Sequence, residues 1–200
     1  MKGSLVIIAF FAAGIACGVT GVVPRSWAES GTDFYALCAL MFCVGVSVGG
    51  DSEIPAKVRS LDRRLMLLPL LTIAGTLGGS ALAALLLDGR RTADCMAIGS
   101  GMGYYSLSSI FITQYRGVEL GTIALMSNII REVATLLFAP LMARWFGPLA
   151  PVTAGGATTM DTTLPIITRV SGERYVVLSL FHGALTDFSV PFLVTFFCSL

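Results

Sequence analysis

Three long apolar stretches constrain this sequence more than any other feature. They cover residues 4–23, 34–50 and 65–87, and none of them contains Asp, Glu, Lys or Arg. An α-helix rises about 1.5 Å per residue, so roughly 20 residues cross a hydrocarbon layer about 30 Å thick. Each stretch therefore predicts a transmembrane helix. The first follows Met1 and Lys2 as a signal peptide would, but its length and the lack of a clean A-x-A site favour a retained helix.

Two later stretches are equally long but carry charge. Residues 120–142 include Arg131 and Glu132, and residues 175–200 include His182 and Asp187. Only 12% of all residues are charged, against about 25% in soluble domains, and 55% are hydrophobic. The sequence therefore predicts an integral membrane protein with about five spanning helices.

Charge and cysteine content exclude several other classes of protein. The net charge of +1 offers no basic surface for nucleic acid. The five cysteines show no CxxC or Cys/His ligand spacing, so they predict apolar packing and no metal site. The sequence also lacks G-x-S-x-G and H-E-x-x-H, so it predicts no enzyme and no cofactor; a Ser106 or Ser108 nucleophile with His182 is only formally possible.

Two stretches between the predicted spans are rich in Gly, Ser and Thr. They cover residues 92–115 and 149–167. Non-helical backbone at membrane depth is tolerated only where it is buried in protein or lines a cavity, so both stretches predict broken or re-entrant helices. Weak continuous helices are the alternative. The residues expected to interrupt the helices are Gly101, Gly103, Gly155, Gly156 and Pro165.

A weak internal repeat relates the two halves of the second part of the chain. A shift of 55 residues places Gly101 on Gly156 and Glu132 on Asp187, and it relates residues 92–145 to residues 148–200. If each broken segment is re-entrant, each unit crosses the membrane an odd number of times and the copies are inverted, as in many secondary transporters. We therefore expect an all-α polytopic membrane protein that forms one transmembrane domain over residues 1–200, with three helices in residues 1–91 before the inverted repeat.

The basic residues predict the orientation of this domain. Residues 51–64 lie between two predicted spans and contain four basic residues, Lys57, Arg59, Arg63 and Arg64. Such loops face the cytoplasm, so the N-terminus is expected inside and the C-terminus outside. Five and seven crossings satisfy this charge pattern equally.

Glu132 is an acidic residue in the middle of an apolar stretch, a position that indicates a functional role. It lies about twelve residues from either end of its predicted helix, where an ionised carboxylate costs about 2.5–3.5 kcal/mol on insertion scales. Arg131 points about 100° away on an ideal helix, whereas Asn128 shares the face of Glu132. An ion pair with another helix is one explanation. A carboxylate that lines a cation pathway is the explanation we favour.

Other polar side chains lie in the same apolar pattern. Asp161 can cap a half-helix or line the pathway, and Asp187 can face a pathway or a partner helix. His182 can relay protons, although a histidine hydrogen-bonded between helices is the simpler interpretation. Tyr104 and Tyr105 can contact a ligand or belong to an interfacial belt.

Four motifs together resemble a known family. They are GSGMGYYSLSSIFIT (99–113), SNIIRE (127–132), GGATTMDTTLPII (155–167) and FHG (181–183), and their order and spacing are similar to those of the bacterial lysine exporter family of the LysO type. The resemblance implies an inner-membrane exporter of L-lysine and thialysine that exchanges them for protons. It also implies that Glu132 is the essential intramembrane acid, within a motif shared with Asn128 and Arg131. Further positions carried over from the family motifs are Tyr104, Tyr105, Ser106, Ser108, Asp161 and Thr163.

The resemblance covers the C-terminal part of the single-chain family members. It implies that the additional N-terminal helices come from a separate subunit or from a second copy of this chain. We expect Glu132, with Asp161 or Asp187, to attract the ammonium groups, and half-helix N-termini near Ser106 and Thr162 to receive the carboxylate. A non-transporting membrane subunit and a passive cation channel are the alternative functions.

Overall fold

The computed structural model describes residues 13–14, 16–22, 46, 64–87 and 89–200. The chain forms two compact units, Met1–Ser47 and Val48–Leu200. In the first unit, residues 13–14 and 16–20 are helical, within the first predicted span. Residues 4–12, 15 and 23 of that span, and the second predicted span except for residue 46, lie outside the described residues. The fold below is that of the second unit.

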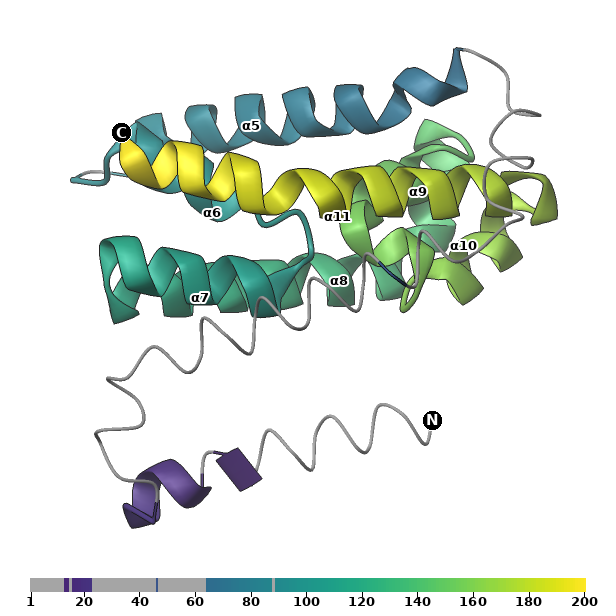
Figure 1. Ribbon diagram of the computed structural model, residues 1–200. Coiled ribbons are helices and arrows are strands. Elements are labelled where there is room, and N and C mark those ends of the chain that lie inside the picture. Colours follow the sequence, from purple (N-terminus) through teal and green to yellow (C-terminus); the bar gives the residue numbers. More distant parts are fainter. Residues whose placement is uncertain (1–12, 15, 23–45, 47–63, 88) are drawn as a thin grey trace. The chain divides into compact units, whose positions relative to one another are not determined.

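Three long helices of this unit are apolar enough to cross a membrane. The first consists of η1 (Leu65–Leu67) and α5 (Leu68–Leu86), the second is α8 (Val118–Phe146), and the third is α11 (Val176–Ser199), which follows η3 (Glu173–Tyr175) (Figure 1). These helices confirm the last three predicted spans. The protein is an all-α, multi-pass membrane protein.

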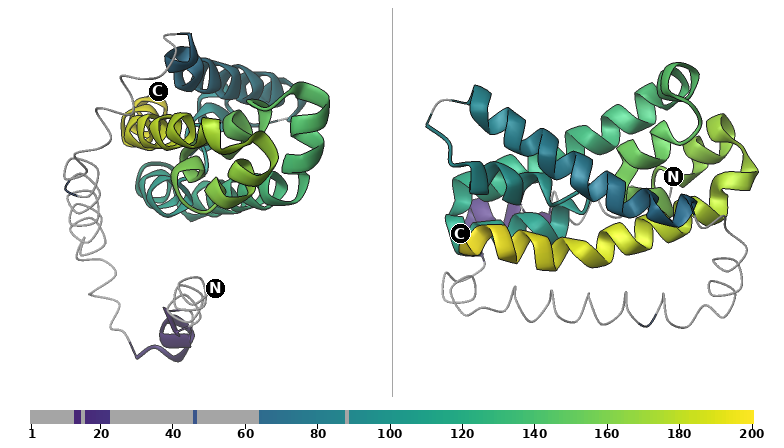
Figure 2. Two further views of the ribbon diagram at one scale, coloured as in Figure 1. Left: turned by 90° about the vertical axis from the view of Figure 1, so that its right-hand side faces the viewer. Right: turned by 90° about the horizontal axis from the view of Figure 1, so that it is seen from above.

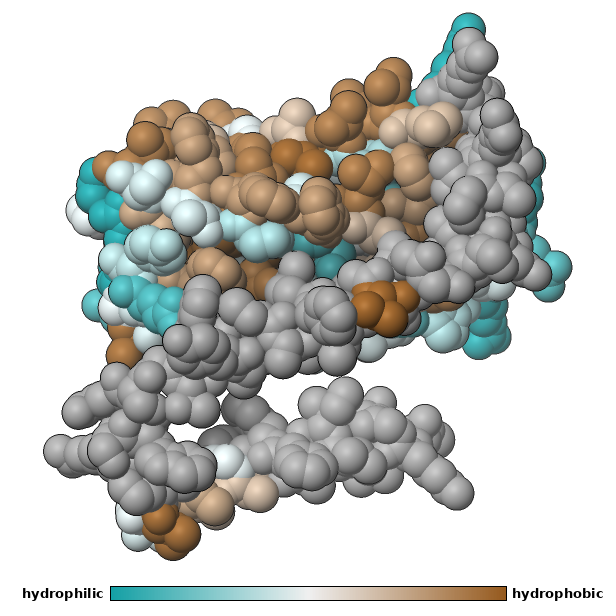
Figure 3. All heavy atoms as spheres, in the orientation of Figure 1, coloured by the Kyte–Doolittle hydropathy of each residue, from teal (hydrophilic) through white to brown (hydrophobic). Residues whose placement is uncertain are grey.

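The outer surface of these helices suits lipid. Leu86 on α5 and Leu137 on α8 are 85% and 66% exposed. Apolar side chains cover most of the visible described surface over α5 and α11, while hydrophilic residues gather toward the two ends (Figure 3). Because lipid tails solvate apolar side chains, this surface is stable in a bilayer without further burial.

The first broken segment enters the bundle and returns to the same end. It consists of α6 (Thr92–Gly99) and α7 (Tyr105–Arg116). Arg116 at the end of α7 pairs with Asp94 at the start of α6, with Nε and Oδ1 3.6 Å apart. Arg90 pairs with Glu119 at this same end, and Arg91 donates to the carbonyl of Leu200. We call this end the first face.

The second broken segment enters from the opposite end, the second face. It consists of α9 (Ala150–Gly155), η2 (Gly156–Met160) and α10 (Leu164–Ser171). Both of its outer ends belong to one apolar cluster with the start of α5 and of α11; the cluster contains Leu68, Val152, Ile167 and Leu178, with Leu65, Leu149, Ile166 and Tyr175 packed against it. The segment therefore also returns to the side from which it enters.

Two re-entrant hairpins of opposite direction thus lie among the three long helices (Figures 1 and 2). The broken character predicted for both segments is confirmed. The second hairpin continues four residues beyond the predicted end at residue 167, because α10 ends only at Ser171, before Gly172. Pro165 does not interrupt a helix but stands in the first turn of α10, where a missing N–H is harmless.

The tips of the two hairpins meet. The amide of Ala157 donates to the carbonyl of Met102 over 2.9 Å. Gly156 has a φ of 63°, and a Cβ at this position would overlap that same carbonyl. A Cβ on Gly103, whose φ is 99°, would stand 3.1 Å from the carbonyl oxygen of Gly155. Glycine is therefore required where the two backbones touch.

We expect Gly156→Ala to destabilise the protein strongly. The left-handed backbone costs an alanine about 1–2 kcal/mol, and overpacking against Met102 adds about 1–3 kcal/mol. Thermal unfolding in detergent measures the effect. The control is Gly78→Ala on α5, where an added Cβ meets nothing within 4 Å. Equal unfolding temperatures for the two variants would contradict the close contact of the tips.

Candidate functional site

Three carboxylates surround the place where the tips meet. Glu132 comes from the middle of α8, Asp161 follows η2, and Asp187 comes from α11. The charges of Asp161 and Asp187 act on the Tyr104 hydroxyl, and those of Glu132 and Asp161 act on Tyr105. Residues from three separate motifs of the sequence are therefore neighbours. Both tyrosines are half-buried at the tip of the first hairpin and not in an interfacial belt.

These carboxylates have no basic partner within the described part of the chain. The two ion pairs there are Arg90–Glu119 and Arg116–Asp94, both at the first face. Asp187 is only 5% exposed. Within the same residues, no three His, Cys, Asp or Glu side chains are close enough together to hold a metal ion.

Asp161 also has a local structural contact. Its Oδ1 accepts hydrogen bonds from the amide of Thr162 over 2.5 Å and from the Thr162 hydroxyl over 3.4 Å. The N-cap of α10 is Thr163, whose buried hydroxyl pairs with Thr158 over 3.2 Å. The carboxylate of Asp161 therefore lies beside the start of α10, and the Asp161 side chain is exposed on the described surface.

Asn128 holds the first tip against α8. Its Oδ1 accepts the amide hydrogen of Gly103 over 2.7 Å, and its Nδ2 donates to the carbonyl of Ala124 over 2.8 Å. Ser108, fully buried, donates to the carbonyl of Tyr104 over 2.8 Å. Ser106 differs from Ser108, because its side chain is exposed. Asn128 thus satisfies an amide that the broken helix leaves unpaired, whereas the Ser108 hydroxyl donates to a carbonyl that already accepts the Ser108 amide.

Arg131 holds the second tip against the same helix. Its Nε donates to the carbonyl of Ala154 over 2.8 Å, and its Nη2 donates to the carbonyl of Thr153 over 3.1 Å. These carbonyls belong to the last turn of α9, where a half-helix carries partial negative charge. The predicted orientation of Arg131 away from the face of Glu132 agrees with these contacts.

His182 joins three elements inside the bundle. Its Nε2 lies 2.9 Å from the Thr72 hydroxyl on α5, and its Nδ1 lies 3.2 Å from the Thr159 hydroxyl in η2. Thr159 lies 2.8 Å from the carbonyl of Gly156 and 2.9 Å from that of Ser179. The Thr159 hydroxyl donates its single proton to a carbonyl, so its oxygen accepts from Nδ1–H of His182. The buried contacts to two threonines on different elements favour the structural interpretation of His182.

Sequence reasoning missed several residues that complete this site. Thr72 and Thr159 hold His182, and Gly183 lets α11 approach η2, since its Cβ would lie 2.7 Å from the amide nitrogen of Met160. Gly183 was visible in the FHG motif. Thr72 in the apolar α5 gives no such signal, because its partner His182 lies 110 residues away in the sequence.

Two re-entrant hairpins of opposite direction that meet between long apolar helices are an arrangement found in many secondary transporters. Residues 8–198 match the family described as lysine exporter LysO, and the chain belongs to this family. The resemblance stated from the motifs is confirmed.

Two relatives illustrate the range of lengths in the family. The lysine exporter LysO of Escherichia coli (strain K12) is 31% identical over 184 residues, which make up 92% of this chain and 60% of that protein. The putative lysine exporter of Haemophilus influenzae is 31% identical over 183 residues, which make up 90% of this chain and 92% of that protein. No solved structure matches this chain.

The network around His182 predicts coupled effects on stability. We expect His182→Ala and Thr72→Val each to lower the free energy of unfolding, because each leaves a buried polar partner unpaired at a cost of about 1–3 kcal/mol. The double variant should lose less than the sum, with a coupling energy of about 1 kcal/mol measured by unfolding in detergent. Ser189→Ala, which removes a hydroxyl bonded only to its own helix, is the control. Strict additivity would contradict the Thr72–His182 contact.

Proposed function

We propose that the protein exports lysine and its analogue thialysine across the bacterial inner membrane by exchange for protons. The observation that carries the proposal is the cluster of Glu132, Asp161 and Asp187 around the hairpin tips, without a basic partner among the described residues. The names of the relatives, lysine exporter and putative lysine exporter, indicate the substrate.

The chemistry of lysine fits such a cluster. The substrate carries two ammonium groups, and hydrogen bonds between ammonium and carboxylate are stronger than those between neutral groups. In a low-dielectric interior the attraction between opposite charges is larger than in water. Carboxylates in such an interior are therefore stabilised when a cation binds beside them.

Exchange follows because a proton and an ammonium group compete for the same carboxylate. Glu132 lies near the middle of the 29-residue α8, about 20 Å from either end, so both ligands reach it only through the protein. Protonation from outside neutralises Glu132 and releases lysine there. Loss of that proton to the cytoplasm restores the charge that binds the next lysine.

The orientation and the assembly are part of the same proposal. The cytoplasmic side is the second face, which follows the basic residues 51–64, and the C-terminus at the first face is periplasmic.

The chain spans about 60% of the length of the E. coli exporter. We propose that a separate N-terminal subunit or a second copy of this chain completes the transporter.

Neutral replacement of the cluster tests the proposal. We expect Glu132→Gln, Asp161→Asn and Asp187→Asn each to reduce proton-driven lysine transport in proteoliposomes by roughly 10–100-fold, as loss of one charged hydrogen bond of about 1.5–3 kcal/mol implies. Glu173→Gln, an exposed acid at the second face, should transport normally. Labelled lysine and an imposed pH gradient provide the measurement.

The same experiment separates the alternatives. A rate of lysine transport that is independent of the pH gradient and depends only on the membrane voltage would indicate a passive channel. Normal transport by a folded Glu132→Gln protein would contradict the mechanism. Loss of folding in that variant, rather than of transport, would favour a structural subunit.

A further inference from the structure

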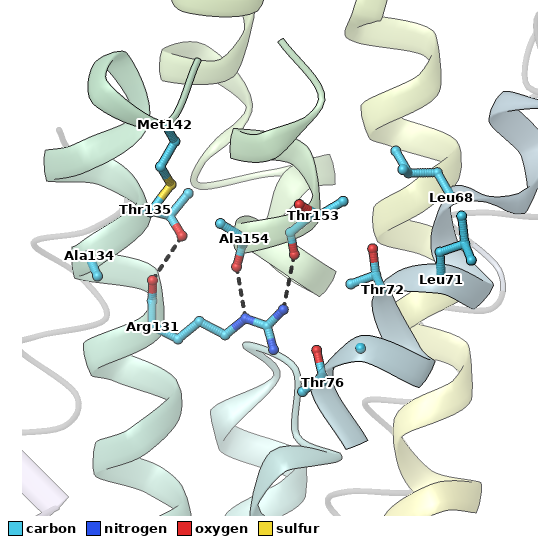
Figure 4. A pocket seen from close by; sticks show the side chains of 11 residues that line it. Leu68, Leu71, Thr72, Thr76, Arg131, Ala134, Thr135, Met142, Thr153 and Ala154 are labelled. Atoms are coloured by element: carbon cyan, nitrogen blue, oxygen red, sulfur yellow. Dashed lines mark hydrogen bonds between the residues drawn. The ribbon is translucent and has the colours of Figure 1, made fainter. Parts of the chain in front are cut away.

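A groove of about 760 Å³ opens between α5, α8 and α9, and the acidic cluster takes no part in its walls. Most of its lining is apolar, but threonines from all three helices and one charged side chain, that of Arg131, also contribute. Figure 4 shows Arg131 reaching across from α8 toward α9, with Thr72 and Thr76 of α5 on the far side. The groove therefore places a single cation in apolar surroundings.

The guanidinium of Arg131 has unused hydrogen-bonding capacity toward this groove. Nε and Nη2 donate to the carbonyls of Ala154 and Thr153. Nη1 has no hydrogen-bond partner among the described residues, and it points toward Thr76 (Figure 4). Within the same residues no carboxylate pairs with Arg131. The two carbonyls hold the guanidinium in place, yet they supply only partial negative charge.

We propose that Arg131 binds the α-carboxylate of the transported amino acid in this groove. The inference deepens the proposed function and rests on it. An arginine whose plane is already fixed loses little conformational freedom when it binds a carboxylate, and charge-assisted hydrogen bonds of this kind are among the strongest in proteins. The free edge of the guanidinium faces this groove, which is wide enough for a small ligand to enter.

The depth of Arg131 selects a small soluble anion over a lipid headgroup. The residue is the 14th of 29 in α8, so it lies about 20 Å along the helix from either end. Headgroups lie outside a hydrocarbon layer about 30 Å thick and do not reach its centre. A carboxylate carried by the substrate itself has access to this depth.

The amide at the start of α10 is less suited to this role. Asp161 already accepts the hydrogen of the Thr162 amide, so an incoming carboxylate would meet a like charge there. Arg131 is free of this conflict. It is also the sequence neighbour of Glu132, and the two side chains leave α8 about 100° apart at one depth. Glu132 does not line the groove, so a carboxylate bound to Arg131 there does not lie against that acidic side chain.

Lysinamide tests the proposal, because it keeps both amino groups and replaces the carboxylate by a neutral amide. Binding of labelled lysine to purified protein in detergent is measured, with unlabelled lysine or lysinamide as competitor. We expect wild type to bind lysinamide at least tenfold more weakly than lysine. Arg131→Gln should bind lysine as weakly as lysinamide while its affinity for lysinamide changes less than threefold. Arg144→Gln, an exposed arginine at the end of α8, should behave as wild type.

Each other outcome decides against the proposal. Equal affinity of wild type for both ligands would show that no carboxylate is recognised. An equal loss of both affinities in Arg131→Gln would show that Arg131 only positions the second hairpin. If this variant does not fold, Arg131→Lys decides, and unchanged discrimination by it would exclude a bidentate guanidinium contact. Equal competition by the two ligands in wild type overturns this inference alone, whereas a wild type that binds no labelled lysine overturns the proposed function as well.

Discussion

The structure depends on one constraint, that backbone polar groups at the centre of a membrane must find partners inside the protein. The two hairpin tips depart from regular α-helix at that depth. They satisfy each other through the Ala157–Met102 hydrogen bond, and α8 satisfies the rest. Asn128 accepts from the first tip, and Arg131 donates to the carbonyls that precede the second. The positions of the hairpins follow from these few bonds.

One short stretch of α8 therefore combines structure and chemistry. Asn128, Arg131 and Glu132 lie within five residues, and they hold the first tip, hold the second tip and supply a carboxylate to the cluster around both. A movement of either hairpin must change the surroundings of Glu132, because the same turn of helix contacts both. This coupling is what an exchanger needs, since ligand binding at the carboxylate must alter which face is open.

Much of this fold could be predicted from the sequence, because a bilayer imposes long apolar runs and excludes broken backbone from lipid. The depth of Glu132 and the glycines of the two tips were therefore informative. Contacts between distant residues could not be predicted in the same way. Thr72 has no periodic or compositional signal, and the carbonyl partners of Arg131 belong to backbone, which every residue possesses. The second predicted span, except for residue 46, and more than half of the first lie outside the described residues, and both spans stay predictions.

The central claim is that both broken segments return to the face from which they enter. Single cysteines at four exposed positions, Thr92, Val118, Phe146 and Glu173, test it in a background in which the five native cysteines are replaced. An impermeant maleimide is applied to vesicles of both orientations. The structure predicts that positions 92 and 118 react from one side of the membrane and positions 146 and 173 from the other. Reaction of positions 92 and 118 from opposite sides would show that the first segment spans the membrane, and would contradict the account.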